Sequence, residues 1–369
     1  MLTNPVETLK KYVDQPSGSH DQADVYAVAA LIQEDFESLG FTVVQHKGPV
    51  CGPTLECTIG TGEKNLMLLG HMDTVFPHDV FVPFKDNGDG TATGSGSYDM
   101  KGGIMIMLYA LKEALPGIDL SKYSIRAIIN PDEEIGSFES EKIILNSAAK
   151  SMGVLSFEPC AGGNRLAVAR KGVTNVTISC KGIPGHAGAQ YKQCASAIQA
   201  LCMHINNLYA LRDDEEEISF NAGVITGGTA ENVVAPSASC RCEFRYFKQP
   251  YQKMLMEKIT AICAQEVVPG VTTTVEFGAS HPAIDLTPES QVLLDYAVAI
   301  GREQGRELIA ERTGGASDIA IAGQAGVGVL DGFGMAGGGA HTAQEYVLLD
   351  AIPQQIELAS KMISRICAD

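Results

Sequence analysis

Apolar residues recur in two patterns through the first part of the chain, as short continuous runs and as longer stretches with apolar residues every three or four positions. The short runs predict strands at residues 41–45, 55–59, 65–70, 123–130 and 154–157. The longer stretches predict helices at residues 24–39, 102–114 and 138–150. Strands that alternate with helices in this way indicate an α/β domain with a mostly parallel, doubly wound sheet covered on both faces.

The pattern changes after residue 170. The expected order is strand, helix, strand, strand, helix, strand, at residues 173–180, 194–211, 218–225, 238–246, 251–267 and 272–277. This β-α-β-β-α-β order is that of a ferredoxin-like unit. Segments of the α/β type then resume at residues 290–304, 327–330 and 352–368. We therefore expect an α/β domain built from residues 1–170 and 282–369, into which a smaller domain at residues 171–281 is inserted.

Composition narrows the function classes. The chain of 369 residues has a formal net charge of −17, which disfavours nucleic acid and anionic membranes as partners. It lacks both an apolar run of about 18 residues and the apolar core of a signal peptide, so we expect a cytoplasmic protein without a membrane span. The ten cysteines have no disulfide-like spacing, and we interpret Cys240 and Cys242 as buried thiols rather than as zinc ligands.

Histidine and acidic residues gather at predicted strand ends. His71, Glu134 and Glu158 each come just after an apolar strand. Because the carboxyl ends of parallel strands face the ligand crevice of an open sheet, we expect these side chains at one edge. Asp99, in a glycine-rich turn ahead of a helix, and His341, in a glycine-rich segment after the last apolar strand, can be aimed at the same edge.

These five residues are nitrogen and oxygen donors without thiolates, a set that suits zinc or a related divalent cation in a catalytic site. Two cations roughly 3.5–4 Å apart need a shared anionic bridge, and we assign that role to Asp99. His71 and Glu158 would complete the shell of one cation, and Glu134 and His341 that of the other. Each residue alone could be an ordinary solvated strand-end or loop residue, but their joint placement favours a metal site.

Two neighbouring residues complete the predicted chemistry. Asp73 lies two positions after His71, on the same side of an extended chain, where it can accept a hydrogen bond from the imidazole and orient it. Glu133 precedes Glu134 and is left to take a proton from the attacking water and pass it to the leaving nitrogen. The sequence therefore predicts metal-assisted hydrolysis of an amide bond.

Seven motifs extend the argument over nearly the whole chain: LLGHMDTV, GSGSYDMKGG, NPDEEIGS, LSFEP, GIPGHAG, ERTGGASD and GGGAHTAQEYV. In this order and spacing they resemble the co-catalytic zinc carboxypeptidase, aminoacylase and deacetylase family, most closely its folate-cleaving glutamate carboxypeptidases. The resemblance implies a zinc-dependent exopeptidase-like domain with a ferredoxin-like lid through which two copies dimerise. It also implies two Zn²⁺ ions, with Co²⁺ or Mn²⁺ as alternatives, and a cis peptide at Asp99–Met100.

The resemblance supports the seven roles above and adds residues of the inserted domain and its surroundings. His186 would stabilise the oxyanion of the tetrahedral intermediate, and Asn232, Arg245, Gly314 and Gly315 would bind substrate. From the residues alone, an exposed turn histidine is the favoured interpretation of His186, which the resemblance reverses, and Arg245 could equally belong to an exposed charged strand face. A guanidinium at residue 245 would suit a substrate with a free carboxylate, which it can clamp through two hydrogen bonds.

The expected function is a glutamate-carboxypeptidase-like hydrolase that acts on a small peptide beside a free carboxylate. An aminoacylase or N-deacylase that acts on N-acyl amino acids is the alternative, because it would use the same metals. A catalytically silent, metal-binding dimer scaffold is a different class, and Glu133 and His186 argue against it since neither is needed to hold metal. The G-x-G-x-x-G string at residues 332–337 is not interpreted as a dinucleotide site, because no helix is expected to begin there.

Overall fold

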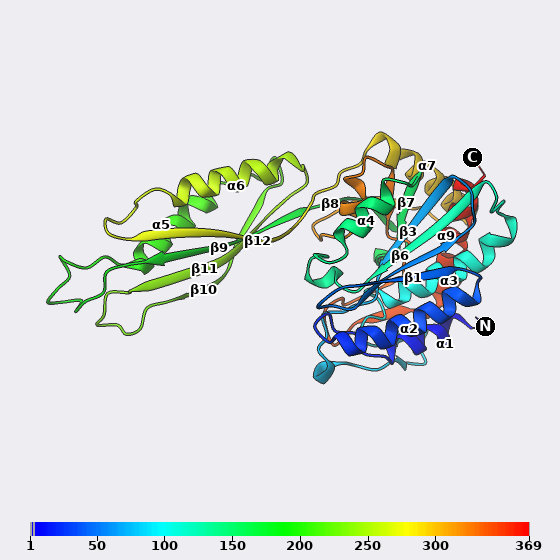
Figure 1. Cartoon of the computed structure of the whole chain (residues 1–369), viewed down its shortest axis with the longest axis horizontal. Coiled ribbons are helices and arrows are strands. Elements are labelled where there is room, and N and C mark those ends of the chain that lie inside the picture. The colour runs from blue at the N-terminus through cyan, green and yellow to red at the C-terminus, as the bar shows by residue number, and fades with distance from the viewer. Residues whose placement is uncertain (1, 3, 369) are drawn as a thin grey trace. The chain divides into compact units, whose positions relative to one another are not determined.

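The computed structural model describes residues 2 and 4–368, and the chain divides into two compact units (Figure 1). Unit 1 comprises Met1–Ala169, Leu286–Thr313 and Ser317–Asp369, and unit 2 comprises Arg170–Asp285 and Gly314–Ala316. The insertion predicted at residues 171–281 falls within the longer segment of unit 2. Each unit is described by itself below.

Unit 1 is built on an eight-stranded sheet in the order β1-β2-β6-β3-β7-β14-β8-β13. The strands are β1 (Thr42–Lys47), β2 (Pro53–Ile59), β3 (Lys64–His71), β6 (Tyr123–Asn130), β7 (Gly153–Ser156), β8 (Arg165–Arg170), β13 (Ile309–Thr313) and β14 (Val329–Asp331). The four central strands β6, β3, β7 and β14 run parallel, whereas β1–β2, β2–β6 and β14–β8 are antiparallel pairs. The sheet is thus mixed, and the prediction of a mostly parallel sheet holds only for its centre.

Helices cover both faces of this sheet. They are α1 (Pro5–Val13), α2 (Gln22–Ser38), α3 (Lys101–Ala114), α4 (Glu141–Ala148), α7 (Pro288–Glu303), α8 (Ile319–Gly323) and α9 (Ile352–Ile366). β3 is buried from its second residue onward and β7 along its whole length, as expected for strands with cover on both faces. Helix α3 is almost entirely buried and packs against β3, α1 and α9 within one hydrophobic core. The α/β fold predicted from the sequence is confirmed.

A small antiparallel sheet in the order β15-β16-β5-β4 also belongs to unit 1. Its strands are β4 (Lys85–Asp86), β5 (Thr91–Thr93), β15 (Gly337–Gly338) and β16 (Tyr346–Leu348). Tyr346 lies opposite Thr93 in the β16–β5 pair, so segments more than two hundred residues apart in sequence leave this sheet side by side. None of its four strands was predicted, and neither were α1, β8 and β13.

Unit 2 is a four-stranded antiparallel sheet in the order β10-β11-β9-β12 with two helices. Its elements are β9 (Gly172–Lys181), α5 (Ala197–Tyr209), β10 (Ser219–Gly227), β11 (Ser237–Tyr246), α6 (Pro250–Cys263) and β12 (Thr272–His281). Both helices pack on the sheet, and buried positions alternate along β11, as expected when one face meets the helices. The predicted β-α-β-β-α-β order is therefore found. Among the described residues of both units, no helix is long and apolar enough to cross a membrane.

Candidate metal centre

The parallel centre of the unit 1 sheet brings three chain segments to one edge. His71 is the last residue of β3 and lies opposite Asn130, the last residue of β6. Glu133 and Glu134 follow in the next turn, and Glu158 lies two residues beyond the end of the neighbouring strand β7. Since the strands are parallel, their carboxyl ends deliver these side chains to the same side of the sheet.

Five predicted ligands form two groups of three that share Asp99. The His71 Nε2 atom lies 3.2 Å from Asp99 Oδ1 and 3.8 Å from Glu158 Oε1. The His341 Nε2 atom lies 3.3 Å from Asp99 Oδ2 and 3.1 Å from Glu134 Oε2. Within each group, one ligand atom per residue lies within 4.8 Å of the others. The two oxygens of Asp99 thus face different histidines, as a carboxylate shared by two cations would require.

The charges of the cluster fit divalent cations. Burial raises the pKa of Glu133 well above its ordinary value and also raises that of Glu134. Burial acts in the same direction on Asp99, but hydrogen bonds with His341 and His71 outweigh it and leave the Asp99 pKa lowered. Glu134 Oε1 is buried and has no hydrogen-bond partner among the residues that the structure describes. Crowded carboxylates with an unpaired buried oxygen are costly unless positive charge is present, and oxygen and imidazole ligands suit divalent metals.

Asp73 is fully buried and contacts residues of both ligand groups. Its Oδ1 atom lies 3.3 Å from His71 Nδ1, which is also 3.1 Å from the Asp73 backbone oxygen. The backbone N–H groups of Glu133 and Glu134 donate to Oδ1 and Oδ2, each at 3.2 Å, and Ser19 Oγ donates to Oδ2 at 2.7 Å. Asp73 therefore holds the His71 ring and the Glu133–Glu134 turn in one arrangement.

The loops of Asp99 and His341 have unusual backbones. The Asp99–Met100 peptide is cis, which confirms the expectation drawn from the family resemblance. His341 has φ of 63°, a left-handed conformation that few residues other than glycine adopt. Its side chain is 53% exposed, so the cluster is open to solvent on the His341 side.

Sequence reasoning missed two supporting residues in the ERTGGASD motif. Only the two glycines of this motif were predicted to act in the site. Ser317 Oγ donates to Glu158 Oε1 at 3.2 Å, so it fixes the carboxylate of a predicted ligand. Asp318 is buried and accepts hydrogen bonds from Asn130 Nδ2, at 2.7 Å, and from Ser137 Oγ. These contacts hold the segment that follows β6. The only signal in the sequence was their place in a motif, because a buried serine or aspartate has no characteristic periodicity.

His186 lies in unit 2, on an exposed turn. Its Nδ1 atom accepts hydrogen bonds from the backbone N–H groups of Gly188 and Ala189, at 3.1 and 3.2 Å. A neutral imidazole that accepts at Nδ1 carries its proton on Nε2, which leaves an N–H donor directed away from the turn. Asn232, also exposed, is joined to this turn through its backbone oxygen, which accepts from Ala187 N–H at 3.0 Å.

Arg245 is engaged within unit 2. Its Nε and Nη2 atoms donate to the two carboxylate oxygens of Glu243, at 2.8 and 3.2 Å, and Nη1 donates to the Gly314 carbonyl at 2.9 Å. A guanidinium has five N–H groups, so two remain for another acceptor. A side chain at Gly314 would meet no atom within 4 Å, and the protein's own packing therefore does not require glycine there. Gly315 follows it in the same short segment of unit 2.

A small cavity of about 240 Å³ adjoins the cluster in unit 1. Glu134 forms part of its wall, together with Gly18, Ser19, His20, Asp21, Thr74, Val75, Pro77 and Ile135. Its lining is mainly apolar, with His20, Asp21 and Glu134 as the ionisable residues. Because a predicted ligand borders it, this cavity can hold a part of a substrate whose reacting bond lies at the cluster.

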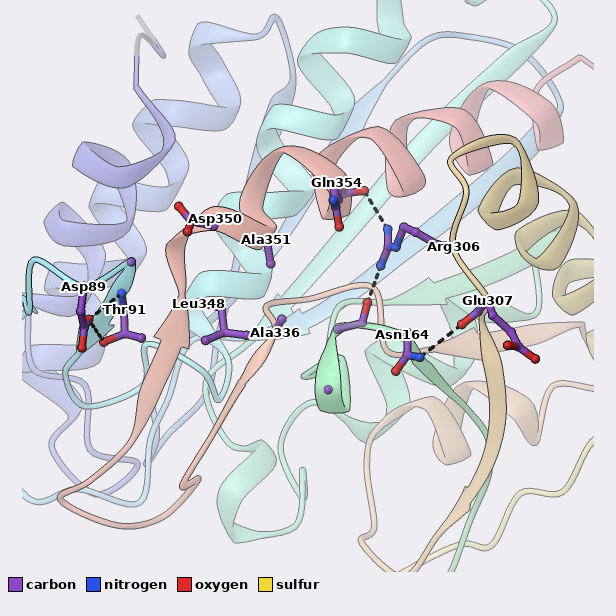
Figure 2. Close-up of a pocket in the computed structure, with 13 residues that line it drawn as sticks. Asp89, Thr91, Asn164, Arg306, Glu307, Ala336, Leu348, Asp350, Ala351 and Gln354 are labelled. Atoms are coloured by element: carbon purple, nitrogen blue, oxygen red, sulfur yellow. Dashed lines mark hydrogen bonds between the residues drawn. The ribbon is translucent and has the colours of Figure 1, made fainter.

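A larger hollow of about 590 Å³, shown in Figure 2, contains none of the predicted site residues. Arg306 lies in its wall and donates to the Gln354 carbonyl at 3.1 Å, to Gln355 Oε1 at 2.6 Å and to the Gly163 carbonyl. These bonds tie the segment after α7 to the start of α9 and to the turn before β8. The guanidinium therefore serves the packing of unit 1 in this region.

Comparisons with known proteins match most of the chain. A family model described as peptidase family M20/M25/M40 matches residues 67–365. The chain is 32% identical over 367 residues to carboxypeptidase G2 of Pseudomonas sp. (strain RS-16), covering 97% of this chain and 88% of the relative. It is 25% identical over 378 residues to succinyl-diaminopimelate desuccinylase of Xylella fastidiosa (strain 9a5c), covering 97% of each. The M20 family metallo-carboxypeptidase Sso-CP2 from Sulfolobus solfataricus shares the fold, with a TM-score of 0.81 at 16% identity over 100% of both chains.

Proposed function

The chain belongs to peptidase family M20/M25/M40 and is a hydrolytic metallopeptidase, and from this premise we propose that it cleaves an amide bond beside a free carboxylate with two bound zinc ions. The family resemblance seen in the seven motifs is confirmed. The observation that best supports the proposed two-metal hydrolysis is the pair of three-ligand groups that share Asp99. In this proposal, Co²⁺ or Mn²⁺ could replace zinc, since each suits the same nitrogen and oxygen donors.

The ligands are assigned as the sequence predicted. His71 and Glu158 would hold one cation, Glu134 and His341 would hold the other, and Asp99 would be shared by both. Bound there, a divalent pair supplies Lewis acidity to the scissile carbonyl and lowers the pKa of the attacking water.

The protein's own groups carry the proton transfers. Glu133 takes a proton from the attacking water as the water oxygen bonds to the carbonyl carbon, and returns it to the nitrogen as the C–N bond breaks. Support comes from its place directly before the ligand Glu134 and from its backbone N–H, which donates to Asp73 Oδ1. Asp73 holds the turn of Glu133 and keeps the His71 proton on Nδ1, which frees Nε2 for a cation. His186 donates from Nε2 to the oxyanion.

Arg245, Asn232, Gly314 and Gly315 are proposed to bind the substrate. The two N–H groups of Arg245 that remain after its internal bonds can receive a carboxylate, which favours a carboxypeptidase-like preference. An N-deacylase on N-acyl amino acids is the second candidate, and the similarity to a succinyl-diaminopimelate desuccinylase favours it. The two candidates differ in which side of the amide is recognised.

We also propose a homodimer formed through unit 2, in the cytoplasm. Strand β10 is one of the two edge strands of its sheet, and Ile225 and Val224 on it are 59% and 42% exposed. Ile198 and Met203 on α5 are each 41% exposed. Open edges and exposed apolar residues are commonly covered by a partner chain. All ten cysteines are free, as is usual in a reducing compartment.

A hydrolysis panel with metal analysis tests the proposal. The protein is stripped with a chelator, reloaded with zinc, cobalt or manganese, and assayed on dipeptides, N-acyl amino acids and folate-like glutamate conjugates, each beside its C-terminal amide. We expect activity to return with two equivalents of metal and to favour substrates with a free carboxylate. Glu133→Gln should lose turnover while keeping both metals. Full activity after exhaustive metal removal would contradict the proposal, and a Glu133→Gln variant with wild-type turnover would remove the proposed base.

A further inference from the structure

Glu345 is a buried carboxylate beside the predicted ligands, and it has no role in the assignment above. Its side chain is 1% exposed. Its Oε1 atom accepts hydrogen bonds from the backbone N–H groups of Tyr98 and Asp99, at 2.7 and 3.0 Å, and Oε2 accepts one from Gly96 at 3.0 Å. All three donors belong to the glycine-rich turn that carries Asp99. One side chain thus accepts hydrogen bonds from three backbone N–H groups of that turn.

The position of Glu345 in the fold places it between two ligand loops. The turn that carries Asp99 begins directly after β5, and the loop that carries His341 ends at Glu345, directly before β16. Because β5 and β16 are paired, both loops leave the small sheet side by side. Glu345 joins them at that end, and at the other end Asp99 Oδ2 and His341 Nε2 lie 3.3 Å apart.

We propose that Glu345 is a positioning residue for the cation pair, which fixes the Asp99 turn against the His341 loop so that both present their ligand atoms to one cation. This inference rests on the metal site of the proposed function. One of the three bonds is made by the Asp99 backbone itself, so a change at Glu345 shifts the residue that both cations share. Outer partners of metal ligands commonly contribute about 10–100-fold to metal affinity or activity.

The chemistry of the contact explains why a glutamate is required. An ionised carboxylate offers two oxygens that only accept, and here they meet three N–H donors. A glutamine has one accepting oxygen, and its NH₂ group would face an N–H of the turn in either orientation. An aspartate keeps the charge and both oxygens, but its side chain is one methylene group shorter, so its carboxylate falls short of the three N–H groups. Both replacements therefore leave buried N–H groups of the turn without an acceptor.

Metal titration of Glu345→Gln and Glu345→Asp tests the inference. Each purified apoprotein is titrated with zinc against a competing chelator and with cobalt while its visible absorption is recorded, and the melting temperature of the apoprotein is measured alongside. Asp350→Asn is the matched control, because it removes a carboxylate from an exposed position in the same part of the chain. We expect both Glu345 variants to bind zinc about 10–100-fold more weakly and to show an altered cobalt spectrum, with the control like wild type.

The outcomes separate this inference from the proposed function. If the wild type binds two cations and the folded Glu345 variants bind them with equal affinity and the same cobalt spectrum, the positioning role is wrong while the metal site stands. A lowered apoprotein melting temperature with unchanged affinity also overturns the role, since it would show that Glu345 acts only on stability. If the wild type binds no cation, the proposed function fails and takes this inference with it. Should Glu345→Gln not fold, the titration of Glu345→Asp decides.

Discussion

Replacing Asp73 by asparagine tests the proposed coupling between the His71 ligand and the Glu133–Glu134 turn. The change keeps the size of the side chain but turns one oxygen into an NH₂ group. If that group takes the place of Oδ1, it meets His71 Nδ1 and the Glu133 N–H. The ring would then accept at Nδ1 and carry its proton on Nε2, the atom proposed to bind a cation. If the group takes the place of Oδ2, it meets the Glu134 N–H instead.

The magnitude follows from the hydrogen bonds that the asparagine cannot make. Either orientation leaves one backbone N–H of the turn opposite another donor, which costs about 1–3 kcal/mol for a buried group, or about 5–150-fold in an equilibrium constant. The Asp73 backbone oxygen, 3.1 Å from His71 Nδ1, still supports the productive tautomer. We therefore expect a loss of zinc affinity of about tenfold, together with a loss of kcat because the same turn carries Glu133.

The assay is zinc competition with a chelator, followed by kcat and KM at saturating zinc, with Asp350→Asn as the control for removing one negative charge. Unchanged zinc affinity and unchanged kcat in Asp73→Asn would show that the hydrogen bonds of Asp73 do not organise the site. A loss confined to the melting temperature would point to the same conclusion.

Three further predictions concern unit 2 and the apoprotein. His186→Ala should lower kcat by on the order of 10²–10³-fold with little change in zinc affinity, measured beside His78→Ala as an exposed control; an unaltered kcat would remove the oxyanion role. Arg245→Ala should reduce kcat/KM about 10–100-fold for substrates with a free carboxylate and much less for their amides, with Arg241→Ala on the same strand as the control; equal losses for both would count against a carboxylate contact. In the apoprotein, burial raises the pKa of Asp318 and of Glu345 to about 7, so the native state binds more protons than the unfolded chain between about pH 4 and 7. The melting temperature of the chelated protein should therefore fall as the pH rises from about 5 to 7, and a rise over this range would contradict these pKa shifts.

The strand ends could be predicted because two simple rules act together there. An apolar run such as residues 65–70 predicts a buried strand, and the geometry of a parallel sheet then places His71 at the ligand edge. The same reasoning brought Glu134 and Glu158 to that edge. The structure places His71 and Glu158 in one ligand group and Glu134 in the other, and both groups include Asp99, as a site built from nitrogen and oxygen donors requires.

The parts that escaped prediction have no periodic signal. Strands β5 and β16 have three residues each, too few for an alternation to be recognised. Glu345 belongs to the His341 motif, but a single glutamate before a tyrosine is indistinguishable in sequence from a solvated one. Arg245 was expected either to contact substrate or to lie on an exposed face. Its hydrogen bond to Glu243 is local to one strand, whereas its bond to the Gly314 carbonyl joins residues 69 positions apart in the sequence. Such contacts depend on tertiary structure that one sequence does not reveal.

The order of the ligands along the chain links metal binding to the folding of unit 1. His71, Asp99 and Glu134 come from its first segment, whereas His341 comes from its last, after unit 2 has intervened. The last segment reaches the others only when β16 pairs with β5 and α9 packs on α3. A cation that needs Asp99 and His341 together therefore binds only the docked arrangement, and it stabilises that arrangement by mass action. The carboxylates of the cluster repel one another and so weaken the apoprotein. The same carboxylates are the groups through which bound metal would join the two ends of the chain.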